Sequence, residues 1–71
     1  MEHRAVSSST ISSIAYDTND STLQIRFRRG GVFNFFNVPD HVWRGLMTAH
    51  SHGQYFHSHI RDRYDCRKIG Q

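Results

Sequence analysis

Hydrophobic and polar residues alternate along the first half of the chain, which is the pattern of β-strands that bury one face only. A first strand is predicted over residues 11–16, followed by the turn-forming run 17–20. The clearest strand spans residues 23–28, with Leu23, Ile25 and Phe27 on one face and Gln24, Arg26 and Arg28 on the other. Gly30-Gly31 favours a hairpin turn, and residues 32–36 are predicted to return as a third strand.

The glycine pair of this hairpin decides which side chains of the third strand face the core. A two-residue turn places Phe33 and Phe35 on the arginine face, as an exposed stacking surface. A three-residue turn over residues 29–31 instead moves both rings into the core and leaves Asn34 with the arginines. Burying the Asn34 amide without a partner would cost about 1–3 kcal/mol. We therefore expect the three-residue turn, with Phe36 as the outward-facing aromatic residue.

After residue 38 the apolar period lengthens to three and four residues, which predicts helices. A first helix is expected over residues 39–50, with Pro39 at its first position and apolar residues at Val42, Trp43, Leu46 and Met47. Gly45 within it indicates close packing of that turn against the sheet. Ser51-His52-Gly53-Gln54 fits a capping box and predicts a second helix. The tail, residues 64–69, forms either a short strand or a surface segment.

These elements predict an α+β domain, a small antiparallel β-meander of about three strands covered on one face by two short helices. With 71 residues the chain allows one domain, expected over residues 6–69 with flexible ends at 1–5 and 70–71. The single cysteine, Cys66, excludes an internal disulfide. The length and the apolar runs exclude a multidomain enzyme, a Rossmann domain and a membrane span. Because the start lacks the apolar segment of a secretory signal, we expect a cytoplasmic protein without a membrane partner.

Arginine carries almost all of the positive charge. Nine Lys plus Arg against six Asp plus Glu give a formal net charge of +3, and Lys68 is the only lysine. Planar guanidinium groups suit phosphates and stacking on rings, although codon bias in a GC-rich genome would produce the same composition. Cations interleaved with aromatic residues are typical of nucleic-acid-binding surfaces. The predicted binding residues are Arg26, Arg28, Arg29 and Phe36 on the sheet, and Arg61, Arg63, Tyr64, Arg67 and Lys68 near the end of the chain.

The other polar residues form no pattern that specifies catalysis or a cofactor. The histidines at positions 50, 52, 57 and 59 do not share a helical face in pairs, and Cys66 has no CxxC partner. The carboxylates lie mostly in predicted turns and helix ends, without the positioned partners that acid–base catalysis needs. We therefore expect a protein that is not an enzyme and holds no metal or other cofactor.

Several short motifs follow one another along the chain: Ser8/Ser9-x-Ile11, Tyr16-Asp17, Leu23-x-Ile25-x-Phe27, Gly31-Val32-Phe33-Asn34-Phe35, Val38-Pro39, Ala49-x-Ser51-x-Gly53-x-Tyr55-Phe56 and Ile60-Arg61-x-x-Tyr64. In their order and spacing they resemble the KTSC domain family, over roughly residues 6–69. The family pattern usually has Tyr-x-Tyr where this chain has Phe33-Asn34-Phe35, and often a polar residue such as Asn at His57. Plain phenyl rings suit packing or stacking and argue against a tyrosine nucleophile or proton donor.

The resemblance implies RNA binding, because the family is named for its occurrence at the C-terminus of some lysyl-tRNA synthetases. It also occurs as a free-standing small bacterial or phage protein. Two functions stay open. The domain binds single-stranded RNA or tRNA through the arginine face of the sheet and the C-terminal basic cluster, or it is a protein-interaction or self-association module without a nucleic-acid ligand. In the second case, apolar surface around Phe36 or Trp43 would be covered by a partner or a second copy.

Overall fold

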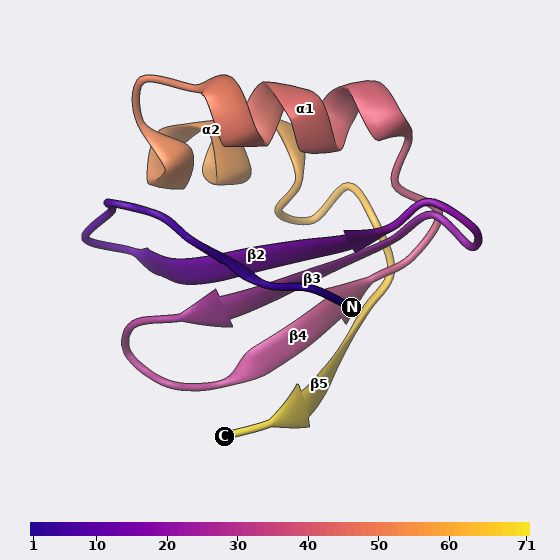
Figure 1. Cartoon of the computed structure of the whole chain (residues 1–71), viewed down its shortest axis with the longest axis horizontal. Helices are drawn as coiled ribbons and strands as arrows, with labels where there is room; N and C mark the ends of the chain where they lie inside the picture. The colour runs from indigo at the N-terminus through magenta and orange to yellow at the C-terminus, as the bar shows by residue number, and fades with distance from the viewer.

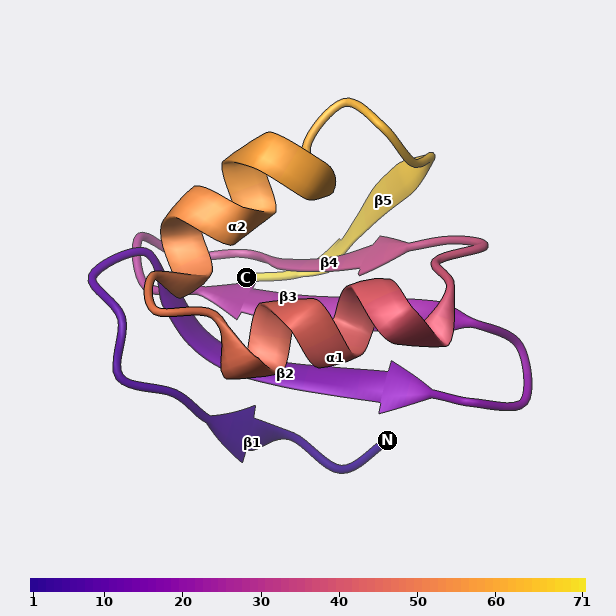
Figure 2. The same ribbon diagram turned by 90° about the horizontal axis from the view of Figure 1, so that it is seen from above.

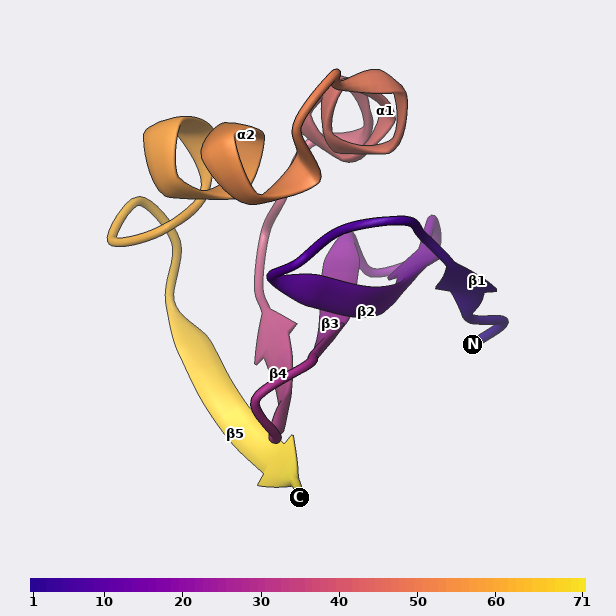
Figure 3. The ribbon, with the colours of Figure 1, turned by 90° about the vertical axis from the view of Figure 1, so that its left-hand side faces the viewer.

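The alternating segments form an antiparallel β-meander that is extended by one further strand at each edge. In a computed structural model that describes residues 1–71, the strands lie in chain order: β1 (Arg4–Ala5), β2 (Ile11–Asp17), β3 (Thr22–Phe27), β4 (Val32–Phe35) and β5 (Cys66–Gly70). Helices α1 (Asp40–Thr48) and α2 (His52–His59) follow β4 and lie on one face of the sheet (Figure 1). No element covers the opposite face (Figure 3). Neither helix has the length and apolar character needed to cross a membrane.

The predicted α+β class is confirmed, but the sheet has five strands and not about three. Within the segment 1–5, which was expected to be a flexible end, Arg4 and Ala5 pair with β2. The tail takes the strand alternative and pairs with β4 through Cys66, Arg67, Lys68 and Gly70. Both added strands are edge strands with almost no buried residues, so they lack the apolar alternation by which a strand is predicted.

The β3–β4 hairpin has the expected faces but a different turn. Ile25 lies opposite Phe33 and Leu23 opposite Phe35, so both phenylalanines lie on the helix-covered face. The expected turn over residues 29–31 would have placed Phe35 opposite Ile25. Instead, the Phe27 N–H donates to the Gly31 carbonyl at 3.0 Å and residues 28–30 make the turn. This shift of two residues leaves every side chain on its expected face.

The Asn34 side chain has a hydrogen-bond partner on the uncovered face of the sheet. This partner explains why β4 directs Asn34 away from the core and Phe33 and Phe35 towards it. Asn34 Oδ1 accepts a hydrogen bond from Gln24 Nε2 at 2.9 Å on the neighbouring strand. Gly31 is required at the end of the turn, because its φ is +96° and a Cβ there would lie 3.0 Å from Phe33 Cε1.

The helices begin and end close to the predicted positions. Pro39 is the N-cap of α1 and not its first residue, and the helix ends at Thr48. Ser51 caps α2 by accepting from the Gln54 N–H at 3.2 Å, as the capping box predicts. Gly45 does not pack against the sheet: a Cβ at this position would overlap the Tyr55 hydroxyl of α2. The small residue therefore lets the two helices approach each other.

The core lies between the sheet and the helices. Its buried members are Ile11, Ile14, Leu23, Ile25, Phe35, Val38, Val42, Leu46, Phe56 and Ile60. Seen from above, α1 runs over β2 and β3, whereas α2 lies towards β4 and β5 (Figure 2). Trp43 of α1 stacks on Tyr16 of β2 with ring centroids 4.8 Å apart, so most of its surface is not free for a partner. Met1 and Ile69 are the only exposed large hydrophobic residues.

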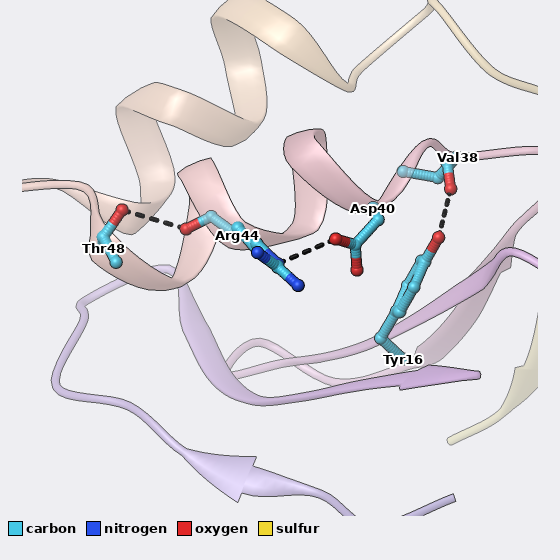
Figure 4. Close-up of polar contacts among 5 residues, drawn as sticks. All are labelled: Tyr16, Val38, Asp40, Arg44 and Thr48. Atoms are coloured by element: carbon cyan, nitrogen blue, oxygen red, sulfur yellow. Dashed lines mark hydrogen bonds and ion pairs between the residues drawn. The ribbon is translucent and has the colours of Figure 1, made fainter. Parts of the chain in front are cut away.

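The Tyr16 side chain joins the sheet to the start of α1 (Figure 4). The Tyr16 hydroxyl donates to the Val38 carbonyl at 2.6 Å, next to the residue that caps the helix. On the outer side of the same helix, Arg44 pairs with Asp40 at 2.7 Å, but both side chains are largely exposed and the pair contributes little. The position of α1 therefore depends on the Tyr16 contact, on the hydrogen bond that the Val38 N–H donates to the Ser21 carbonyl, and on core packing.

Substitution Tyr16→Phe should lower the free energy of unfolding by about 1–2 kcal/mol, because the buried Val38 carbonyl loses its donor. Urea unfolding followed by far-UV circular dichroism measures this difference. Tyr64→Phe is the matched control, since the Tyr64 ring also packs against the core but Tyr16 is the only tyrosine whose hydroxyl donates within the chain. Equal stability changes in the two variants would contradict the anchoring role.

Candidate nucleic-acid interface

An apolar cleft opens on the helix-covered face, between α2 and the strands β3, β4 and β5. Its volume is about 570 Å³. Each bordering element contributes to the lining: Ser9 and Thr10 before β2, Phe27 of β3, Arg29 and Gly30 of the hairpin turn, Phe33 and Phe35 of β4, Phe56 and His57 of α2, Arg61 and Asp62 after α2, and Cys66 of β5. We call this surface the aromatic cleft. It exists because α2 covers only part of the apolar side of β4.

Four phenylalanine rings form the floor of the aromatic cleft. Phe27 meets Phe33 at a centroid distance of 5.7 Å and Phe56 at 5.2 Å, both edge to face. Phe35 completes the set with contacts of 6.5 Å to Phe33 and 5.5 Å to Phe56. Phe35 and Phe56 are buried, whereas Phe27 and Phe33 are partly exposed. These edge-to-face contacts fix the rings, so the exposed surfaces of Phe27 and Phe33 are preorganised.

The rim of the cleft is cationic. Arg29 belongs to the hairpin turn and has no ion pair. The two ion pairs of the chain are Arg44 with Asp40 and Arg61 with Asp62. The Arg61–Asp62 pair is long, at 3.9 Å, and its side chains are 61% and 91% exposed, so water screens it strongly. Arg61 Nη1 also donates to His57 Nδ1 at 3.4 Å. Both arginines can therefore turn towards an anion in the cleft.

The uncovered face of the sheet carries a connected row of polar groups. His3 Nε2 lies 2.6 Å from Gln24 Oε1, which must accept because Gln24 Nε2 donates to Asn34. His3 Nδ1 lies 2.8 Å from the Ser13 hydroxyl, within hydrogen-bond distance. Two arginines flank the row on the same face: Arg67, opposite Asn34 on β5, and Arg26, opposite Val32 on β3.

β5 forms the border between these two surfaces. Cys66 and Lys68 lie opposite Phe35 and Phe33, on the side of the cleft, whereas Arg67 lies on the uncovered side. The Lys68 Cε atom also lies beside Gly31. We use the name basic edge for the cations of β5 together with those of β3, of the β3–β4 turn and of the segment after α2 that lie on this half of the sheet: Arg26, Arg29, Arg61, Arg67 and Lys68.

The remaining predicted binding residues are occupied within the domain. Arg28 Nε donates to the Ser8 carbonyl and Nη2 to the Val6 carbonyl at 3.4 Å, so this side chain holds the segment between β1 and β2. Arg63 Nε donates to the Ser58 carbonyl at 3.1 Å. Phe36 and Tyr64 are both partly buried, and the Phe36 N–H donates to the Asp65 carbonyl at 2.9 Å.

Sequence reasoning missed the aromatic cleft. It assigned Phe27, Phe33 and Phe35 to the core, and the structure confirms that face. It gave no sign that two of the floor rings stay partly exposed, because that depends on where α2 crosses the sheet. The polar residues also form no group of three or more His, Cys, Asp and Glu side chains close enough to hold a metal ion.

Fold and cleft together define a small α+β domain whose candidate site is a preorganised aromatic and cationic surface. The sequence pattern of the KTSC domain matches residues 7–64, and the chain therefore belongs to the KTSC domain family. The crystal structure of a KTSC domain protein from Yersinia pestis superposes with a TM-score of 0.95, at 39% identity over 97% of both chains.

Two further relatives differ greatly in length. A lysine–tRNA ligase of Trichormus variabilis is 38% identical over 61 residues, which is 86% of this chain but 11% of the ligase. A protein of Tsukamurella paurometabola is 30% identical over 59 residues, 83% of this chain and 88% of that protein. The domain is thus found both within a long ligase chain and as most of a short protein.

Arg28→Gln should lower the free energy of unfolding by about 0.5–1.5 kcal/mol, because two backbone carbonyls lose a charged donor. Arg26→Gln should change it by less than about 0.5 kcal/mol, since Arg26 is exposed and makes no hydrogen bond or ion pair within the chain. Urea unfolding of both variants tests the assignment. A larger loss for Arg26→Gln than for Arg28→Gln would overturn it.

Proposed function

We propose that this domain binds single-stranded RNA, or an unpaired stretch of tRNA, through the basic edge, and that it catalyses no reaction. The observation that carries the proposal is that the five cations of the basic edge, on both sides of β5, lack a close carboxylate partner. Phosphate binding needs several cations within reach of one backbone, and each engaged cation releases condensed counterions.

The charge distribution along β3 supports this proposal. At one end of the hairpin strands, the carboxylates of Asp17 and Asp20 accept backbone N–H bonds at 2.8 and 3.1 Å within the β2–β3 turn. At the other end, the β3–β4 turn carries Arg29 without a carboxylate partner. Anionic and cationic turns are therefore separated by the length of the strand, which produces a polarised domain that orients a polyanion before contact.

The spacing of the cations also suits a flexible strand. Arg26 and Arg67 lie on β3 and β5, two strands apart and offset by two residues along them, which corresponds to about 12 Å between their Cα atoms. Arg29 and Arg61 lie on the covered side of the sheet, in the lining of the aromatic cleft. These cations lie on both sides of the sheet, so a ligand that contacts all of them must bend around the sheet edge. A flexible single strand can bend in this way, whereas a rigid duplex cannot contact both sides of the sheet. The relation to a stretch of lysine–tRNA ligases makes RNA the expected polyanion.

A second candidate is self-association through β5. One observation favours it: β5 pairs only with β4 and is exposed along most of its length. Antiparallel pairing of two copies would bring together Arg67 and Lys68 of both chains, and this repulsion opposes the contact. We therefore place RNA binding first, and an RNA-independent dimer that persists at high salt would favour the second candidate.

Binding of a fluorescein-labelled single-stranded RNA of about 12 nucleotides, measured by fluorescence anisotropy, tests the proposal. Affinity should fall steeply between about 50 and 200 mM salt. Charge reversal at one edge residue, Arg29→Glu or Arg67→Glu, should weaken binding roughly tenfold and reduce the salt slope by about 0.7 per lost phosphate contact.

The matched control is Arg4→Glu, which changes the net charge equally but lies on β1, at the opposite edge of the sheet. It should leave the affinity within about twofold of the wild type. No detectable binding at low salt, or equal losses in the edge and control variants, would contradict the proposed site.

A further inference from the structure

We infer that the aromatic cleft receives one unpaired nucleobase of the bound strand, an inference that rests on the proposed RNA binding and assigns a base pocket to it. The cleft lies on the same side of β5 as Lys68 and is bordered by Arg29 and Arg61. A strand that follows the basic edge therefore passes its mouth.

The floor of the cleft offers ring surface and not only apolar volume. Phe35 and Phe56 are 4% and 6% exposed and hold the floor from below, whereas Phe27 and Phe33 keep part of their rings accessible. Phe33 is held by Phe27 and Phe35 and borders Gly31, so it cannot turn away without disturbing the hairpin. Exposed, fixed aromatic rings are the surfaces on which unpaired bases stack.

The size and the edges of the cleft suit a base. A volume of about 570 Å³ lies within the range of small-ligand pockets, about 300–1,000 Å³, and exceeds what a single inserted aliphatic side chain needs. The lining also includes the hydroxyls of Ser9 and Thr10 and the carboxylate of Asp62, which can bond to the polar edge of a base. An acyl chain offers no donor or acceptor to these groups.

Charge complementarity selects the occupant. The lining carries two arginines and one carboxylate, so an aromatic group that brings its own anion is favoured over a neutral ring. A nucleotide has this composition: the base contacts the phenylalanine floor, and the adjoining phosphate contacts Arg29 or Arg61. The position of both arginines at the rim, and not on the floor, matches the order of groups along a nucleotide.

The test compares two ligands of equal charge: a single-stranded RNA of about 12 nucleotides, and an abasic strand with the same number of phosphates. Wild-type protein should bind the RNA about 5- to 160-fold more tightly than the abasic strand, the range for stacking of one base. Phe33→Leu keeps apolar volume but removes the ring, so it should lose this preference while its affinity for the abasic strand stays unchanged. Phe33→Tyr keeps the ring and should retain the preference.

The outcomes separate the two proposals. Failure of the wild type to bind either strand would overturn the proposed function. Equal affinity of the wild type for both strands would overturn base capture and leave phosphate binding intact. This comparison uses the wild-type protein alone, so it does not depend on whether a variant folds. A preference that survives in Phe33→Leu would also overturn the assignment of the cleft. Emission of Trp43, which stacks on Tyr16 beneath α1 and outside the cleft, reports whether each variant is folded.

Discussion

Two short helices cannot cover the apolar face of a five-stranded sheet, and this mismatch shapes the whole domain. α1 has nine residues and α2 eight, so each is only about 12–14 Å long. Five strands span about 19 Å across, and β2, with seven residues, is about 23 Å long. α1 is fixed over β2 and β3 by the Tyr16–Trp43 stack and by Leu46. α2 is left to cover the β4 side, and the uncovered remainder of that side is the aromatic cleft.

The two faces of the sheet meet their surroundings in different ways. On the covered face, close approach of the helices at Gly45 and the four-phenylalanine floor supply apolar packing. On the other face, His3, Gln24 and Asn34 bond to one another across the strands, so their polar groups need no covering element. The edge strand β5 separates these faces, and it contributes Arg67 and Lys68 to the basic edge. The proposed binding surfaces are therefore the aromatic cleft, where helix packing on the sheet is incomplete, and the basic edge, where the cations lack close carboxylate partners.

The strands that bury one face were predictable from sequence, and the rest of the sheet was not. Alternation at Leu23, Ile25 and Phe27 predicted β3 because each of these side chains packs against the helices. The face of Phe33 and Phe35 followed from the polarity of Asn34. The exact turn did not follow, because a shift of two residues leaves every side chain on the same face and so leaves no trace in the pattern. β1 and β5 bury too little surface to show any pattern.

The candidate site was predictable only as a set of residue types. The arginines could be named from the sequence. It could not be predicted that Arg28 donates to the carbonyls of Ser8 and Val6 while Arg29, the next residue, has no ion pair. These outcomes depend on loop positions, which have no periodicity. The cleft itself arises from the crossing of α2 over β4, and no local motif specifies that crossing.

The central claim is that a single-stranded RNA occupies the aromatic cleft, and the lone thiol tests it most directly. Cys66 is exposed and lines the cleft, and the chain has no other cysteine, so its alkylation by neutral iodoacetamide reports on this surface alone. Saturating RNA is predicted to slow the alkylation at least several-fold, with the unprotected rate restored at high salt. Saturation by RNA, shown by anisotropy, with an unchanged alkylation rate would contradict the account.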